Sequence, residues 1–535
     1  MTTITPYRSD LGPGRDGFAQ LLHAEWTKFR TVRGWIIGVI VAVLVGGGLG
    51  LLTAGGSQSA CQSSTSTGTG QSGSGAACGG PYFPLGPGGE PVSDDFYFVH
   101  QPLAGDGSIT VRLASMSGFI ALPDGGPGQP VPGLQEWAKA GIIVKANLNP
   151  GSAYAAMMVA ADHGVRMQWN YTGDTAGLPG AVSAASPRWL RLTRAGDVLT
   201  GYDSSDGTHW TQVGTVTLAG LPATVQAGLF TTSPYDVVIS TAFGGTSRSS
   251  TSTQATGVFD RLTRSGTWSS GSWTGTYVGG GSYYSTGQGK YHQADGTFTV
   301  TGSGDIAPVP AGHGNPDDSA LTLTDYLVGT FAGLIAIAVV AALFITGEYR
   351  RNLIRTTLAA SPRRGRVLAA KATVIAAVSF VAGAVAAAVA VLIGGMITRD
   401  RGYAEFPAPW TTELRVIIGT GVLVAVAAVL ILAVGAIVRR SAATVTIAIV
   451  ALVIPYFLAA VSLVPLGVAD WLLRVTPAAG VARQPAYPAY AQVTALYSPR
   501  SGYYPLAPWA GLLVLAAWTA LALAGAVYLL RRRDA

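Results

Sequence analysis

The chain has 535 residues and a formal net charge of +7, and only 11% of its residues are charged. Its mean hydropathy is +0.37, and low charge with positive hydropathy argues against one large soluble core and for several membrane spans. The excess of Lys and Arg lies in short clusters beside apolar runs. That placement is typical of residues that fix membrane topology, so the basic charge predicts a lipid bilayer, and no nucleic acid, as partner.

Residues 1–34 begin with a polar stretch and continue as FAQLLHAEWTKFRTVRG. Apolar residues and one glutamate recur there at helical spacing, together with basic residues: Phe18, Leu21, Leu22, Glu25, Phe29, Lys28, Arg30 and Arg33. The pattern predicts a cytoplasmic N-terminus with an amphipathic helix on the inner leaflet. The apolar run 35–54 is long enough to be the first transmembrane helix. The alternative is a cleaved signal peptide, whose basic region would be unusually long here.

Residues 55–93 form a Ser/Gly-rich stretch with too little apolar surface to fold, which predicts an extracellular linker. The stretch holds both cysteines of the chain, Cys61 and Cys78. In an oxidising compartment the two thiols are expected to form one disulfide. The alternative is two free thiols within a linker.

Residues 94–245 contain short apolar segments separated by turn residues, such as GSITVRLAS, AGIIVKA and RWLRLTRA. The dipeptide Asp206-Gly207 lies between two alternating segments and predicts a hairpin turn. Many strands at near-regular spacing predict an extracellular all-β antiparallel sandwich. Residues 246–318 are interpreted as a linker and a small β segment, which is either an extra subdomain or the closing strands of the sandwich.

The order of the predicted strands resembles the laminin-G and concanavalin-like jelly rolls attached to bacterial surface proteins. The resemblance covers about residues 94–243, and its most recognisable part is YDSSDGTHW at 202–210. Surface sandwiches of this kind often bind glycans, because aromatic faces stack on sugar rings. The resemblance therefore implies a cell-wall glycan as partner, with Trp137, Trp169 and Tyr171 as exposed aromatic candidates.

Other residues of the predicted sandwich have simpler interpretations. Trp189 and Trp210 lie in alternating strands and are expected in the core. Asp203 and Asp206 are either oxygen ligands of a calcium ion or, as is far more common, turn residues. We predict no metal site.

Motifs of known catalytic chemistry are missing from the sequence. It has no G-x-x-x-x-G-K-[ST] phosphate loop, no H-E-x-x-H and no C-x-x-C. Glycoside hydrolysis needs a pair of carboxylates, and many aspartates here lie in Gly-flanked turns such as Asp106-Gly107 and Asp295-Gly296. We therefore predict that the chain is not an enzyme and holds no cofactor of its own.

Residues 326–535 are mostly apolar, and five further spans are predicted at 326–346, 372–397, 416–438, 442–464 and 509–530. The dense basic clusters fall on one side of the membrane if six spans alternate. That side is expected to be the cytoplasm, which places both termini inside and the β region outside a plasma membrane. The spans carry almost no ionisable residues, a feature that disfavours a proton-coupled carrier. Pro455 predicts a kink in the fifth span.

The loop 347–371, GEYRRNLIRTTLAASPRRGRVLAAK, is a dense basic segment between the second and third spans. This loop, the entry LLHAEWTKFRTVRGW and the six-span count resemble the permease subunit of an ATP-binding-cassette (ABC) transporter of the type-2 exporter class. The resemblance implies six helices per subunit, a connecting helix before the first span, and a homodimer or paired permeases. It also implies a separate cytoplasmic ATPase subunit that binds the ATP.

In that family the loop after the second span carries the coupling helix, which docks on the ATPase. The corresponding residues in this chain are Glu348, Tyr349, Arg350, Arg351, Arg355, Thr356, Thr357, Pro362 and Arg364. The alternative is a basic loop that only fixes topology. The inserted β region departs from the family pattern and leaves the exported substrate open. A second interpretation of the whole chain is a membrane-anchored glycan-binding or sensor protein without transport activity.

Overall fold

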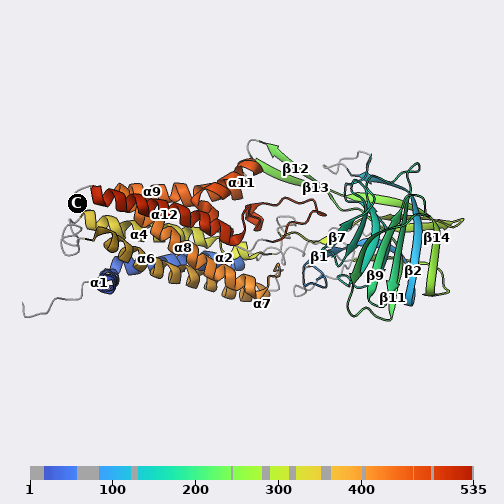
Figure 1. The fold of residues 1–535 in the computed structure, drawn as a ribbon, viewed down its shortest axis with the longest axis horizontal. Coiled ribbons are helices and arrows are strands. Elements are labelled where there is room, and N and C mark those ends of the chain that lie inside the picture. The colour runs from blue at the N-terminus through green and yellow to red at the C-terminus, as the bar shows by residue number, and fades with distance from the viewer. Residues whose placement is uncertain are drawn as a thin grey trace, which may run out of the picture.

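The computed structural model describes residues 17–56, 83–121, 130–242, 245–279, 289–311, 321–350, 363–400, 405–461, 463–483 and 487–532. The described residues form an elongated molecule with a helix bundle at one end and a β domain at the other (Figure 1). The C-terminus and the first helix lie at the end of the bundle remote from the β domain. The chain is thus a helical protein with a large all-β insertion, as the sequence predicts.

Within the described ranges, six helical segments are long and apolar enough to cross a membrane: Arg33–Ala54, Leu323–Arg350, Arg364–Asp400, Trp410–Val438, Ser441–Ala460 and Pro508–Arg532. These confirm the six predicted spans. The helices are α1 (Phe18–Thr31), α2 (Arg33–Gly56), α3 (Leu323–Tyr326), α4 (Gly329–Arg350), α6 (Arg364–Ala388), the π-helical turn η1 (Val389–Ile393), α7 (Gly394–Asp400), α8 (Trp410–Val438), α9 (Ser441–Leu452), α10 (Ile454–Ala460), α11 (Leu466–Val475), the 3₁₀ helices η2 (Pro477–Arg483) and η3 (Pro499–Ser501), and α12 (Pro508–Arg532).

Two details of the spans have direct causes in the sequence. The fifth span divides into α9 and α10 next to Pro455, because proline lacks the amide hydrogen that a continuous helix needs. The third span begins with helix α6 at Arg364, inside the predicted loop 347–371. The predicted start of this span at residue 372 is therefore too late, since the basic residues before it are already helical.

Small residues let the helices approach closely. A Cβ atom added to Gly329 of α4 would lie 2.1 Å from the carbonyl oxygen of Gly46 in α2. Backbones in such contact exclude any larger side chain, which is how small residues support packing in membrane bundles. The buried core of the bundle is made by α4, α6, α8 and α12 around residues such as Leu334, Ile375 and Leu515.

The described part of the β domain contains the following strands: β1 (Val92–Asp94), β2 (Phe96–Ile120), β3 (Val131–Pro132), β4 (Lys139–Lys145), β5 (Tyr154–Ala160), β6 (Gly164–Trp169), β7 (Gly173–Ala176), β8 (Arg188–Ala195), β9 (Val198–Ser204), β10 (Thr211–Thr217), β11 (Thr224–Thr232), β12 (Asp236–Ala242), β13 (Gly245–Thr251), β14 (Thr253–Trp268), β15 (Thr274–Val278), β16 (Lys290–Ala294), β17 (Thr297–Gly302) and β18 (Ile306–Pro308). Fourteen of them form one sheet, whose main order is β10-β9-β8-β2-β11-β4-β5-β6-β7.

This sheet folds back on itself around the long strand β2. One part of β2 pairs with β11 and β15, and its other part pairs with β8 and β14. As a result β5 packs against β8 and β9 across a core of aliphatic and Met side chains. The two halves form a sandwich-like, nearly closed sheet. The predicted hairpin is confirmed, since β9 and β10 pair antiparallel around Gly207, which has φ +79°.

Of the two interpretations left open for residues 246–318, the sheet pairing agrees with closing strands of the sandwich, so the β domain extends past the predicted boundary at residue 245. Strands β14 and β17 belong to the same sheet, because β14 pairs with β2 on one side and with β17 on the other. The predicted linker between residues 246 and 256 contributes to β13 and β14. Thr is β-branched and fits a pleated sheet, so a Ser/Thr-rich segment can form strands here although its composition is typical of a linker.

The chain enters and leaves the β domain at neighbouring points. The short strands β1 and β18 pair antiparallel, with Val92 opposite Pro308 and Asp94 opposite Ile306. Two fully buried lysines at the ends of β4 bind these segments: Lys145 Nζ lies 2.6 Å from Asp94 Oδ2, and Lys139 Nζ lies 2.6 Å from Asp305 Oδ1. Each lysine thus fixes one end of the insertion to the same central strand.

Candidate functional site

Helix α1 lies at the end of the bundle remote from the β domain (Figure 1). Its sequence FAQLLHAEWTKFRT is rich in helix-forming residues, and Lys28 and Arg30 in its last turn suit the negative end of the helix dipole. Val32 takes an extended conformation and separates α1 from α2. Glu25 and Phe29 are the buried residues of α1, so one face of the helix carries both an apolar anchor and a charge.

The apolar anchor is an aromatic contact between α1, α2 and α4. The Phe29 ring lies 5.9 Å from Trp35 and 5.7 Å from Phe344, measured between ring centroids. Trp35 and Phe344 meet edge to face at 5.0 Å. Such pairs stabilise beyond their buried area, and together they fix α1 against the start of α2 and the last turns of α4.

Next to this anchor lies a group of four charges, the buried Glu25, Glu348 and Lys371 and the half-buried Lys28, which we call the ion cluster. Lys371 Nζ lies 2.6 Å from Glu25 Oε2 and 2.7 Å from Glu348 Oε1. Lys28 Nζ lies 2.8 Å from Glu25 Oε1 and 3.1 Å from Glu348 Oε1. The cluster therefore joins α1 to the end of α4 and the start of α6.

The ion cluster is balanced in charge and largely removed from water. Lys371 is 1% exposed, Glu25 2% and Glu348 7%. Lys371 Nζ also lies 4.7 Å from the centre of the Phe344 ring, a favourable cation–π position. Glu348 Oε2 has no hydrogen-bond donor within the described part of the chain. Its carboxylate therefore has capacity for one further donor.

The structure brings several predicted coupling residues to the same region. Tyr349 follows Glu348 on α4, and the Arg439 guanidinium lies 4.9 Å from its ring centre. Arg364 at the start of α6 donates a hydrogen bond to the carbonyl of Leu530 near the end of α12. Both ends of the loop thus contact other helices of the bundle. Arg350 is exposed, and Arg351, Arg355, Thr356, Thr357 and Pro362 lie outside the described residues.

Three members of the ion cluster were not predicted as site residues: Glu25, Lys28 and Lys371. A signal for two of them is present in the sequence. Glu25 falls on the apolar stripe of an amphipathic helix, and Lys371 falls at the apolar start of a span. A charge on an apolar face needs a partner, but only the fold shows which opposite charges meet.

The predicted glycan-binding aromatics do not form an exposed platform. Trp137 is 5% and Tyr171 1% exposed, and Trp169 is half-buried. Trp137 stacks on His163 at 3.7 Å, and Tyr171 meets Tyr154 edge to face. The expectation that Trp137 and Tyr171 are exposed is therefore wrong, because both rings pack inside the domain.

Two tryptophans expected in the core lie instead at the domain surface. Trp189 and Trp210 are half-buried. Arginine side chains lie over both rings, and the Arg191 guanidinium is 3.9 Å from the centroid of the Trp210 ring. Asp203 Oδ2 accepts a hydrogen bond from the Leu178 amide, whereas Asp206 caps its own turn through Thr208 and His209. The two aspartates therefore bind different segments of the chain and do not share a ligand site.

The two cysteines predicted to form a disulfide, Cys61 and Cys78, lie outside the described residues.

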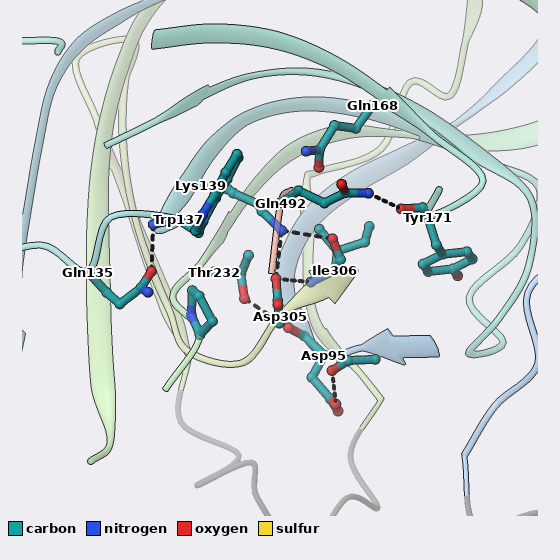
Figure 2. Close-up of polar contacts among 12 residues, drawn as sticks. Asp95, Gln135, Trp137, Lys139, Gln168, Tyr171, Thr232, Asp305, Ile306 and Gln492 are labelled. Carbon is teal, nitrogen blue, oxygen red and sulfur yellow. Dashed lines mark hydrogen bonds and ion pairs between the residues drawn. The ribbon is translucent and has the colours of Figure 1, made fainter. Parts of the chain in front are cut away.

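The β domain contains a second cluster of polar side chains, near the points where the chain enters and leaves the domain (Figure 2). Asp95 is 8% exposed, accepts a hydrogen bond from Ser93 Oγ at 3.1 Å, and lies near Asp94 and Asp305. Burial, together with these two carboxylates, raises the pKa of Asp95 to about 7. The charged form of Asp95 is therefore disfavoured in the folded domain.

Replacement of Asp95 by asparagine is expected to stabilise the protein at pH 8. The pKa of Asp95 is raised on folding from 3.8 to about 7, so its contribution to stability is present below pH 4 and lost as the pH rises to 7. The Asp95→Asn side chain keeps an oxygen acceptor for Ser93 and removes the buried charge. The free energy of unfolding at pH 8 should rise by about 1–3 kcal/mol.

Thermal unfolding of parent and Asp95→Asn protein between pH 5 and pH 8 measures this effect. The difference in melting temperature should grow with pH. Asp295→Asn, at the exposed turn between β16 and β17, is the matched control and should show no such trend. An equal difference at both ends of the pH range would contradict the assignment.

The comparisons with known proteins identify the bundle. The sequence profile described as "ABC-2 family transporter protein" matches residues 20–535. The chain belongs to the ABC-2 transporter family. It is therefore a multi-pass membrane protein of a family of transporter membrane components. The match begins inside α1 and includes all four residues of the ion cluster. A search of curated protein sequences finds no match for this ABC-2 protein.

Solved structures match only part of this ABC-2 protein. A functionally unknown protein from Saccharomyces cerevisiae has 15% identity over 32% of this chain and 75% of its own, with a TM-score of 0.19. The GH43 protein BlXynB from Bacillus licheniformis has 17% identity over 30% of this chain and 28% of its own, with a TM-score of 0.19. Scytalido-glutamic peptidase has 9% identity over 41% and 100%, with a TM-score of 0.23. Likeness at this level says nothing about function.

Proposed function

We propose that this chain is the permease subunit of an ABC exporter, driven by a separate cytoplasmic ATPase that docks on the loop 347–371. The observation that carries the proposal is the ion cluster. It joins both ends of that loop, Glu348 on α4 and Lys371 on α6, to Glu25 of α1. A loop that only fixed topology would not need its two ends tied to a third helix through buried charges.

The proposed mechanism follows from these contacts. Movement of a docked ATPase displaces the loop, and the displacement reaches α4 through Glu348 and α6 through Lys371. Because both residues bind α1, the three helices move together rather than separately. Helices that are packed and linked in this way switch between two discrete arrangements and do not deform continuously. The contacts of Arg364 with α12 and of Tyr349 with Arg439 extend the movement to the other helices.

The orientation is part of the proposal. Basic residues gather at the end of the bundle that holds the ion cluster, as the helix ends and contacts of Arg350, Arg364, Arg439 and Arg531 show. By the positive-inside rule this end is cytoplasmic, so the β domain is extracellular and the membrane is the plasma membrane. We also propose a dimer of permeases. Side chains of α2 such as Leu44 and Leu52, 66% and 68% exposed, are available to a second subunit or to lipid.

Co-purification from the native host in mild detergent tests the proposal. An ABC ATPase should accompany the parent protein, and an Arg350→Glu/Arg351→Glu variant should lose most of that ATPase and its ATP turnover, because two reversed charges repel a surface that accepts basic residues. Lys290→Glu, on an exposed strand of the β domain, is the control. The proposal fails if no ATPase accompanies the parent and the loop variant behaves like the parent.

The second interpretation, a glycan-binding surface protein without transport, is less well supported. Two of the three aromatic residues predicted to bind glycan, Trp137 and Tyr171, are buried inside the β domain. A protein that only anchors a β domain would also not need the ion cluster to link α1, α4 and α6.

A further inference from the structure

A short loop of the membrane part reaches into the β domain. This segment, residues 490–497, lies between η2 and α12, and we call it the outer loop. Its fold is fixed by one side chain: the Tyr497 hydroxyl lies 3.1 Å from the carbonyl oxygens of Tyr490 and Val493, and the Tyr490 amide donates to it at 3.2 Å. The hydroxyl therefore closes the loop and presents Gln492 between these contacts.

Gln492 is buried in the β domain rather than exposed at the loop surface. It is 5% exposed, and its Nε2 donates a hydrogen bond of 3.2 Å to the carbonyl oxygen of Tyr171. Figure 2 shows Gln492 among Lys139, Gln168 and Tyr171 of the β domain. Thr494 Oγ1 donates a second hydrogen bond to Glu136. Two side chains of the outer loop thus bind two separate turns of the β domain.

The outer loop is continuous with elements that pack tightly against each other. A Cβ atom added to Gly511 of α12 would lie 2.1 Å from the carbonyl oxygen of Ala479 in η2. Trp518 Nε1 of α12 donates a hydrogen bond of 2.8 Å to the Val475 carbonyl at the end of α11. Helices α11, η2 and the first half of α12 therefore pack together in the docked arrangement, and the outer loop, which joins η2 to α12, acts where the two meet.

We propose that the docked outer loop is a latch: Gln492 and Thr494 hold the β domain against the outer ends of η2 and α12 and keep them together. Withdrawal of the β domain releases the outer loop and lets η2 and α12 separate. The contact suits a reversible device, because its direct polar part is two hydrogen bonds, which contribute only modestly, beside the packing of Tyr497 in a small cluster with Ala311 and Tyr503. The latch needs no ATPase to operate, so it stands apart from the proposed energy coupling.

Thiol accessibility tests the latch in the full-length protein in membrane vesicles. Cys61→Ser and Cys78→Ser remove the native thiols, and Ala482→Cys places one reporter beside Gly511, at a position where the native residue is 2% exposed. A membrane-impermeant thiol reagent is added from the outside. In the Gln492→Ala/Thr494→Val background the reporter should react about tenfold faster than in the parent, since two anchoring hydrogen bonds are lost.

Two controls separate the latch from a folding defect. Thr494→Ser keeps the donor to Glu136, and Ala491→Ser changes the exposed neighbour of Gln492; both should label at the parent rate. Spin labels at Val198→Cys and Arg500→Cys, both exposed, report the distance between the β domain and the membrane part. The inference holds if the distance distribution broadens and labelling accelerates in the double variant. It is overturned if labelling stays at the parent rate, whether or not the distances change.

Discussion

Replacement of Lys371 by methionine is expected to lower the free energy of unfolding by about 3–5 kcal/mol, the cost of breaking a buried ion pair by removing one partner. Lys371 holds Glu25 and Glu348 together and is itself 1% exposed. Without it, two buried carboxylates face each other with Lys28, whose side chain is 39% exposed, as their partner in the ion cluster. Chemical unfolding in detergent micelles measures the loss.

A double-mutant cycle with Glu348→Gln isolates the pair. Glu348→Gln alone should cost less than Lys371→Met, because Glu25 remains to pair with both lysines. The double variant should be more stable than the sum of the two losses predicts, since the second change removes a charge that the first left unpaired. Arg350→Met, on the exposed end of α4, is the control for removal of a basic residue. Additive losses would mean that Lys371 and Glu348 do not interact.

Replacement of Lys145 by methionine is expected to destabilise the β domain by about 3–5 kcal/mol for the same reason. Lys145 and Asp94 have no exposed side-chain surface. Lys145 Nζ also donates to the Ser152 carbonyl and the Tyr171 hydroxyl. After the change Asp94 Oδ2 keeps one donor, the Gly151 amide. The melting temperature of the β domain in the full-length protein should fall by roughly 10 °C.

The reverse change, Asp94→Asn, is expected to cost less. Burial lowers the pKa of Lys145 below its usual value despite the nearby Asp94 carboxylate, so an unpaired Lys145 can lose its proton and become neutral. Thermal unfolding of the two variants and of the exposed control Lys290→Met ranks the effects. Equal losses for Lys145→Met and Lys290→Met would contradict the role given to the buried pair.

The membrane part could be predicted from the sequence because its signal is composition over long windows. A run of about twenty apolar residues matches the thickness of a bilayer and is rare elsewhere, and Pro455 marks the break between α9 and α10 correctly. The limits of the helices are harder to predict. Arg364 begins a helix although it lies in a basic segment, since arginine is a good helix former and its charge alone says nothing about helix limits.

The β domain could be predicted in class but not in extent. Alternating segments such as β8 and β9 are strands where predicted, because one face of each is buried. Strand β2 runs through the dipeptide Asp106-Gly107, for which the sequence predicts a turn. Bulges between β2 and β14 absorb this irregularity. Whether a Gly-flanked aspartate ends a strand depends on the partner strand, which local sequence does not contain.

The sequence draws attention to the loop 347–371 but does not single out Glu25, Lys28 and Lys371 of the ion cluster. Glu348, Tyr349 and Arg364 are identified by their place in a basic loop, whereas Lys371 and Glu25 lie at the edges of predicted segments. Their pairing joins positions 346 residues apart in the chain. No periodicity or spacing within one segment carries that information. The aromatic candidates failed for a related reason, since exposure is a property of the folded domain and not of residue type.

Because β1 pairs with β18, the β domain needs only two neighbouring attachment points on the helix bundle. Its two ends leave side by side, with Val92 opposite Pro308, so the host helices α2 and α4 can remain in contact through Gly46 and Gly329 whatever is carried between them. A helix bundle of this ABC-2 family can therefore hold an inserted domain at this place without repacking the contact between α2 and α4. The same geometry would let another extracellular module replace this one with the α2–α4 contact unchanged, whereas the outer loop would need new partners for Gln492 and Thr494.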